Sequence, residues 1–78
     1  MGVLYELLNL KGKEVEVSAI DDIVDEIRDY PFMATKFTKE HRVFEFMECF
    51  IEVKYEFNKE ESIKMRDKVK ITDVIAMY

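Results

Sequence analysis

The strictest alternation of apolar and charged residues in the chain runs from Lys13 to Val17. An alternation with a period of two predicts a half-buried strand whose valines face a core. The preceding residues 3–10 are apolar in both helix and strand registers. They form either a short helix that ends at Lys11 and Gly12 or a first strand that turns through these two residues. The pattern leaves both alternatives open.

A stretch with helical periodicity follows this strand. Its apolar residues are Ile20, Ile23, Val24 and Ile27. This spacing predicts an amphipathic helix over residues 19–29 or 19–30. Ser18 followed three residues later by Asp21 is typical of a capping box at the helix start. The helix must end before Pro31, because proline disfavours helical geometry in the residue before it and has no N–H to donate.

Residues 43–57 are crowded with aromatic and β-branched side chains, a composition that favours strand. From Met47 onward the odd positions are apolar and most even positions are charged. Phe44 and Phe46 break this pattern because they fall on the polar side, which predicts a bulge or bend near Glu45. A helix over the first half of the segment is the competing interpretation. In both cases the segment belongs to the core.

The last segment, residues 63–77, again places apolar residues at odd positions. Its even positions carry a basic stripe of Lys64, Arg66, Lys68 and Lys70. If this strand pairs with the preceding one around the polar loop 58–62, Glu56 opposes Lys64 and Glu52 opposes Lys68. The sequence therefore predicts an α+β fold: an antiparallel sheet of four or five strands with one long amphipathic acidic helix, and a short N-terminal helix as an alternative to a first strand.

The length of 78 residues predicts a single domain that spans residues 1–78. A chain this short buries only about 60 to 65% of its unfolded surface, so its core is small and a homodimer is expected. Cys49 is the only cysteine and His41 the only histidine, so neither a disulfide nor a zinc site is expected. The single thiol and the absence of an apolar stretch of about 20 residues favour a cytoplasmic protein.

The net charge of −5 argues against general affinity for nucleic acid or anionic lipid. The negative charge is concentrated in residues 14–29, where seven acids and one arginine give a sum of −6. Acids near the helix start are explained by the helix dipole. Later in the helix, Asp25, Glu26 and Asp29 each follow another acid by one turn, a spacing that costs about 0.2 to 0.5 kcal/mol per pair. These later acids point to a partner.

The favoured function is a small, acidic, non-enzymatic protein-binding module. In its most specific form it is an inhibitor or nucleic-acid mimic of the kind found in bacteriophages, which occupies the basic surface of a DNA-binding protein. The expected partner-binding residues are Glu14, Glu16, Asp21, Asp22, Asp25, Glu26 and Asp29. The simplest alternative is a solvated acidic face that contributes only to solubility.

Two other functions compete with this one. A dimeric structural or assembly module would use a long aromatic hairpin, with Phe44, Phe46 and Phe50 as its interface. A nucleic-acid-binding domain would use the basic stripe, although the neighbouring glutamates and the acidic total oppose it. An enzyme ranks last, because His41 lies in a polar turn and Cys49 on an apolar strand face. No catalytic residue, cofactor or metal is expected.

Overall fold

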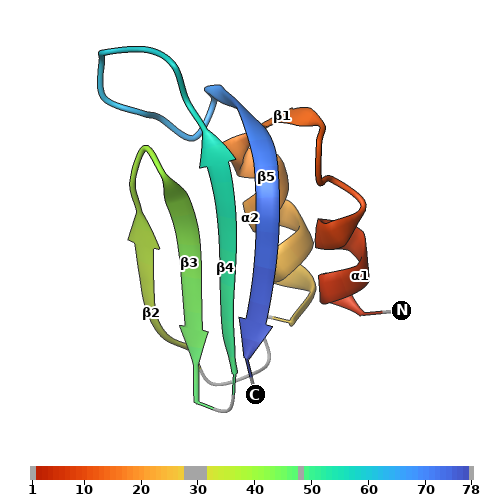
Figure 1. Ribbon diagram of the computed structural model, residues 1–78. Helices are drawn as coiled ribbons and strands as arrows, with labels where there is room; N and C mark the ends of the chain where they lie inside the picture. Colours follow the sequence, from red (N-terminus) through yellow and green to blue (C-terminus); the bar gives the residue numbers. More distant parts are fainter. Residues whose placement is uncertain (1, 28–31, 48, 78) are drawn as a thin grey trace.

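The computed structural model describes residues 2–27, 32–47 and 49–77. The elements follow in chain order as α1 (Val3–Leu8), β1 (Glu14–Glu16), α2 (Val17–Val24), the 3₁₀ turn η1 (Asp25–Ile27), β2 (Phe32–Phe37), β3 (His41–Phe46), β4 (Phe50–Glu56) and β5 (Lys68–Met77). The strands form one antiparallel half-barrel sheet in the order β1-β5-β4-β3-β2 (Figure 1). The strands β1 and β2 are its two edges.

Both helices lie on the same side of the sheet, and α1 packs against α2 and β5 (Figure 1). The core lies between the helices and this face of the sheet. Its fully buried members include Leu7 from α1, Ile20 from α2, Val53 from β4 and Ile71 from β5. These side chains come from elements distant in sequence, so their burial joins the two helices to the centre of the sheet.

Residues 3–8 adopt the helical alternative, and the chain leaves α1 through a turn that requires glycine. Gly12 has a φ of +84°, a left-handed conformation that residues with a Cβ rarely adopt. Its N–H donates to Ile71 O at 2.8 Å, and Ile71 N–H donates to Lys13 O at 2.9 Å. These two bonds join the turn to β5 and place β1 at the edge of the sheet.

The prediction of one long acidic helix is wrong. The α-helix α2 has eight residues, from Val17 to Val24, and is followed by the three-residue turn η1. Asp21 and Asp22 each precede another acid by one turn, and this repulsion disfavours a longer α-helix. A 3₁₀ turn is a common way for a helix to end. Residues 28–30, which the sequence analysis placed at or near the helix end, lie outside the described residues.

The predicted capping box at Ser18 is also wrong. The helix begins two residues earlier than predicted, with Glu16 at the N-cap position and no side-chain hydrogen bond there. The first amides of α2 are satisfied by the backbone of the loop before β5. Val17 N–H donates to Asp67 O at 3.0 Å, and Ser18 N–H donates to Met65 O at 2.9 Å. A distant segment therefore provides the cap that the local sequence was expected to provide.

The change of parity near Glu45 marks a hairpin rather than a bulge in one continuous strand. Phe46 N–H donates to Cys49 O at 2.9 Å, and the chain reverses between these two residues. In β3 the even positions Phe44 and Phe46 therefore face the helices, whereas in β4 odd positions such as Ile51 do so. The parity that faces the core changes between the two strands because the register pairs even positions of β3 with odd positions of β4, as Phe44 with Ile51.

The predicted register of the last two strands is wrong as well. Glu56 opposes Lys70, and Glu52 opposes Ile75. The loop before β5 extends to Asp67, whose carboxylate accepts a hydrogen bond from Lys64 N–H at 2.8 Å. This turn keeps the first predicted residues of the strand in the loop, so β5 begins at Lys68.

No helix in the described part of the chain is long and apolar enough to cross a membrane.

Candidate functional site

The structure separates the acids that the sequence analysis grouped as one partner-binding surface. Glu14 and Glu16 are exposed on β1 and lie directly opposite Lys70 and Lys68 of β5. On its other side, Lys70 lies opposite Glu56 of β4. Opposite charges at facing positions of an antiparallel pair stabilise the sheet. The two acids of β1 therefore have a local structural explanation.

Asp21 has a different role, since it points toward the sheet and binds Arg42 of β3. Arg42 Nε donates to Asp21 Oδ1 at 2.9 Å, and Arg42 Nη2 donates to Asp21 Oδ2 at 2.8 Å. The Arg42 side chain is only 8% exposed and that of Asp21 is 27% exposed. This bidentate pair is the strongest geometry available to a carboxylate and a guanidinium, and it connects α2 to the sheet.

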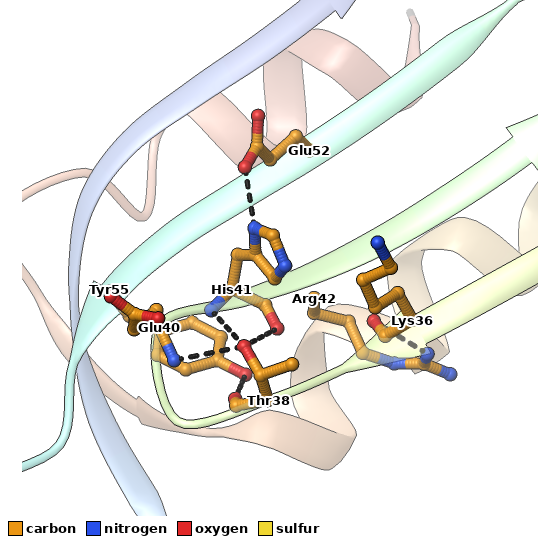
Figure 2. Close-up of polar contacts among 7 residues, drawn as sticks. All are labelled: Lys36, Thr38, Glu40, His41, Arg42, Glu52 and Tyr55. Atoms are coloured by element: carbon orange, nitrogen blue, oxygen red, sulfur yellow. Dashed lines mark hydrogen bonds and ion pairs between the residues drawn. The ribbon is translucent and has the colours of Figure 1, made fainter.

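The surroundings of Arg42 fit a buried guanidinium. Its planar group lies over the ring of Phe44 at 4.5 Å and near that of Phe37 at 5.7 Å. Arg42 Nη1 also donates to Lys36 O at 3.4 Å (Figure 2). Nearby, the Tyr55 hydroxyl donates to Thr38 O at 2.6 Å (Figure 2). Burial raises the pKa of Tyr55 well above its usual range, with Arg42 opposing the shift and Asp21 adding to it.

The remaining acids of the stretch gather where α1 meets the end of α2. Asp22, Asp25 and Glu26 are exposed. The Glu26 carboxylate hydrogen-bonds the side chain of Glu6 on α1, and this contact is the main cause that raises the pKa of Glu6 above its ordinary value. We call this group the acidic end, and it consists of Glu6, Asp22, Asp25 and Glu26. The remaining predicted acid, Asp29, lies outside the described residues.

Three members of the acidic end, Glu6, Asp22 and Glu26, lack the neutralisation found elsewhere among the described residues. Within residues 2–27, 32–47 and 49–77, no Lys or Arg nitrogen lies within 4.0 Å of the carboxylates of Glu6, Asp22 or Glu26. When both are ionised, the neighbouring carboxylates of Glu6 and Glu26 repel each other. The electrostatic potential at this end of the molecule is therefore negative.

The basic stripe is divided between two elements. Lys64 and Arg66 lie in the loop before β5, whereas Lys68 and Lys70 lie in the strand itself. The two strand lysines face glutamates in neighbouring strands. The four cations therefore do not form the continuous surface that a nucleic-acid backbone requires.

The three phenylalanines proposed for an interface also separate. Phe44 is 3% exposed and Phe46 is 8% exposed, and both belong to the core of the chain itself. These two rings pack in one cluster with side chains of the chain's own helices, such as Leu7 and Ile20. Phe50 is half-buried and lies opposite Met77, which is 58% exposed.

A pocket of about 310 Å³ lies at the end of the β3–β4 hairpin. We call it the hairpin pocket, and its lining residues are Glu45, Phe46, Met47, Cys49 and Phe50. Met47 is 69% exposed, and Cys49 is a half-buried free thiol. The described lining residues are mainly apolar, and Glu45 adds an exposed carboxylate. The sequence pattern gave no sign of this pocket, because it predicts one continuous segment over residues 43–57 rather than a hairpin.

His41 does not lie in a solvated turn, because it begins β3 and contacts β4. Its Nδ1 lies 2.6 Å from Glu52 Oε2, and the side chains are 26% and 16% exposed (Figure 2). The turn before it is closed by Thr38, whose Oγ1 accepts hydrogen bonds from the N–H groups of Glu40 and His41 (Figure 2). Among the described residues, no group of three His, Cys, Asp or Glu side chains is arranged to hold a metal ion.

No family model, no curated protein and no solved structure matches this chain.

Proposed function

We propose that the protein is a small, acidic, non-enzymatic protein-binding module whose acidic end binds a basic surface, most specifically the nucleic-acid-binding surface of a DNA-binding protein. One observation carries this proposal. The exposed carboxylates of Asp22 and Glu26, together with Glu6, have no cationic partner among the described residues, whereas other acids of the same stretch face lysines or bind Arg42. Because Cys49 is the single cysteine of the sequence and a free thiol, we also propose that the protein is cytoplasmic.

Electrostatics favours this kind of partner. Uncancelled carboxylates on the ends of two packed helices attract a positively charged surface and steer its approach. They also stand in for phosphates, because both present anionic oxygens to Arg and Lys side chains. The proposed binding surface is more compact than the row expected from the sequence, since Glu14 and Glu16 face lysines.

Charge reversal at the acidic end tests the proposal. The variant carries Asp22→Lys and Glu26→Lys, and its matched control carries Glu60→Lys and Glu61→Lys, which change the net charge equally. The control residues are exposed in the loop between β4 and β5, at the opposite end of the molecule (Figure 1). Both variants are first checked for folding by circular dichroism and thermal unfolding.

The measurement is capture of basic DNA-binding proteins from host extract, with elution by a salt gradient and competition by duplex DNA. We expect the unmodified protein and the control to retain the same partner, to release it as salt rises and to lose it to DNA. The reversed variant should not retain it. If the reversed variant folds and captures the same partner unchanged, the proposal is wrong.

A dimeric assembly module remains the second candidate, because Met47 and Met77 are exposed apolar side chains at the hairpin end. Sedimentation of the purified protein over a range of concentrations distinguishes it. Association that does not weaken with salt would favour this candidate.

A further inference from the structure

The hairpin pocket and the acidic end lie toward the same end of the molecule. The turn η1 ends at Ile27, and β2 begins at Phe32, which pairs with Phe46 of the hairpin. Five residue steps of fully extended chain span at most about 18 Å, so η1 lies within that distance of β2. Figure 1 shows the end of α2, the β3–β4 hairpin and the end of β5 toward the same end of the structure.

The pocket has the size and lining of a site for an apolar side chain. Its volume of about 310 Å³ is at the lower limit of typical small-ligand pockets, which span about 300 to 1,000 Å³. Met47 lines the pocket and is exposed, and the exposed Met77 lies opposite the lining residue Phe50 in the sheet. Methionine is flexible and polarisable, so it adapts to the shape of a bound side chain.

Charge decides which occupant fits. The exposed carboxylate of Glu45 borders the pocket, and the acidic end lies at the same end of the molecule. A second copy of this chain would bring the same negative groups and a net charge of −5 into contact with them. A basic protein segment would instead place its Lys or Arg side chains against these carboxylates while one apolar residue enters the pocket.

We propose that the hairpin pocket binds one apolar side chain of the basic protein segment that the acidic end recognises. The proposal rests on the proposed function and adds the source of its specificity. Charge attracts many basic surfaces, whereas a shaped apolar pocket selects those that carry a large apolar residue at the right place.

Two synthetic peptides of equal length test the proposal. Both consist of lysine and serine, and they differ only at the central position, which is phenylalanine in one and serine in the other. Their affinities are measured by calorimetry at low and high salt. We expect the phenylalanine peptide to bind about tenfold more tightly, which corresponds to partial burial of one aromatic side chain. Both peptides should bind more weakly at high salt.

Substitutions in the pocket and beside it test where the phenylalanine side chain binds. Met47→Ser and Met77→Ser should remove the preference for the phenylalanine peptide and leave the affinity for the serine peptide unchanged. Met65→Ser is the matched control, because Met65 is an exposed methionine in the loop before β5. Methyl resonances of Met47 and Met77 should shift with the phenylalanine peptide, whereas that of Met65 should not.

The remaining outcomes contradict the proposal in distinguishable ways. Equal, salt-dependent binding of both peptides would overturn the pocket assignment and leave the proposed function standing. Salt-independent binding of the phenylalanine peptide alone would overturn the proposed function together with the basic partner. Dimerisation of the protein that Met47→Ser abolishes would assign the pocket to a second copy of the chain.

Discussion

Asp21 and Asp22 are neighbours in the chain, yet they belong to regions with opposite properties. Asp21 binds the buried guanidinium of Arg42 in a bidentate pair between α2 and the sheet. Asp22 lies about 100° further around the helix and is exposed at the acidic end. The first carboxylate holds the fold together, and the second leaves its charge available to a partner.

This difference shows that a cluster of acids in a sequence is not one functional unit. A buried charge is tolerated only when it is paired and hydrogen-bonded, and the Asp21–Arg42 pair meets this condition. Exposed carboxylates are solvated and need no partner for the protein to fold. Mutations in the two regions should therefore affect different quantities.

The largest expected effect follows from removing the acid of the buried pair. Asp21→Ala leaves the Arg42 guanidinium, with its side chain only 8% exposed, without its carboxylate. The free energy of unfolding should fall by about 3 kcal/mol, measured by urea denaturation. Asp22→Ala is the control and should change it by less than about 0.5 kcal/mol. Equal effects of the two variants would show that the pair does not stabilise the fold.

Arg42→Met should lower the free energy of unfolding by less than Asp21→Ala does. It leaves Asp21, whose side chain is 27% exposed and gains hydration more easily, and it places an apolar side chain among Phe37 and Phe44. We expect a loss of about 1 to 2 kcal/mol in urea denaturation. The double variant Asp21→Ala, Arg42→Met should lose less than the sum of the two single variants, because neither charge remains unpaired. Additive losses would contradict the direct coupling.

The neutral hydrogen bond of the Tyr55 hydroxyl, which lies near the Asp21–Arg42 pair, should contribute less to the free energy of unfolding than that pair does. Tyr55→Phe removes the hydroxyl that donates to Thr38 O at 2.6 Å and leaves the ring in place. The free energy of unfolding should fall by about 1 kcal/mol, measured under the same conditions. A loss as large as that of Asp21→Ala would mean that the hydroxyl, rather than the ion pair, dominates this region.

The smallest expected effect on stability lies at the acidic end, where a substitution should stabilise the fold rather than destabilise it. The contact with Glu26 raises the pKa of Glu6 in the folded protein. A carboxyl group whose pKa is higher in the folded state binds its proton more tightly there, so stability is gained as the pH falls through the range just above the ordinary pKa of a glutamate. It is lost again as the pH rises through the folded-state pKa.

Glu6→Gln should therefore raise the melting temperature slightly at pH 7 and flatten its dependence on pH just above the ordinary pKa of a glutamate. Thermal unfolding of this variant and of Glu61→Gln, an exposed control in the β4–β5 loop, measures both quantities. A decrease in melting temperature at pH 7 would show that the Glu6–Glu26 contact stabilises the fold.

The prediction of the strands succeeded where side chains alternate and failed where the chain turns. The apolar odd positions of residues 51–55 face the core. The hairpin after Phe46 was interpreted as a bulge because it has no glycine, proline or Asn-Gly signal. Arg42 was also missed as a core residue, although it shares its parity with Phe44 and Phe46. That shared parity was the available signal.

Taken alone, the sequence determined the apolar periodicity of α2 and of the strands, the end of the first element at Gly12 and the concentration of acids in residues 14–29. These properties are local, because they depend on residues a few positions apart. Only the tertiary structure decided where α2 begins, which strand faces Lys70 and which acids are neutralised. Those outcomes depend on contacts between segments that are distant in the sequence, such as Asp21 of α2 and Arg42 of β3. No local pattern specifies which segments meet.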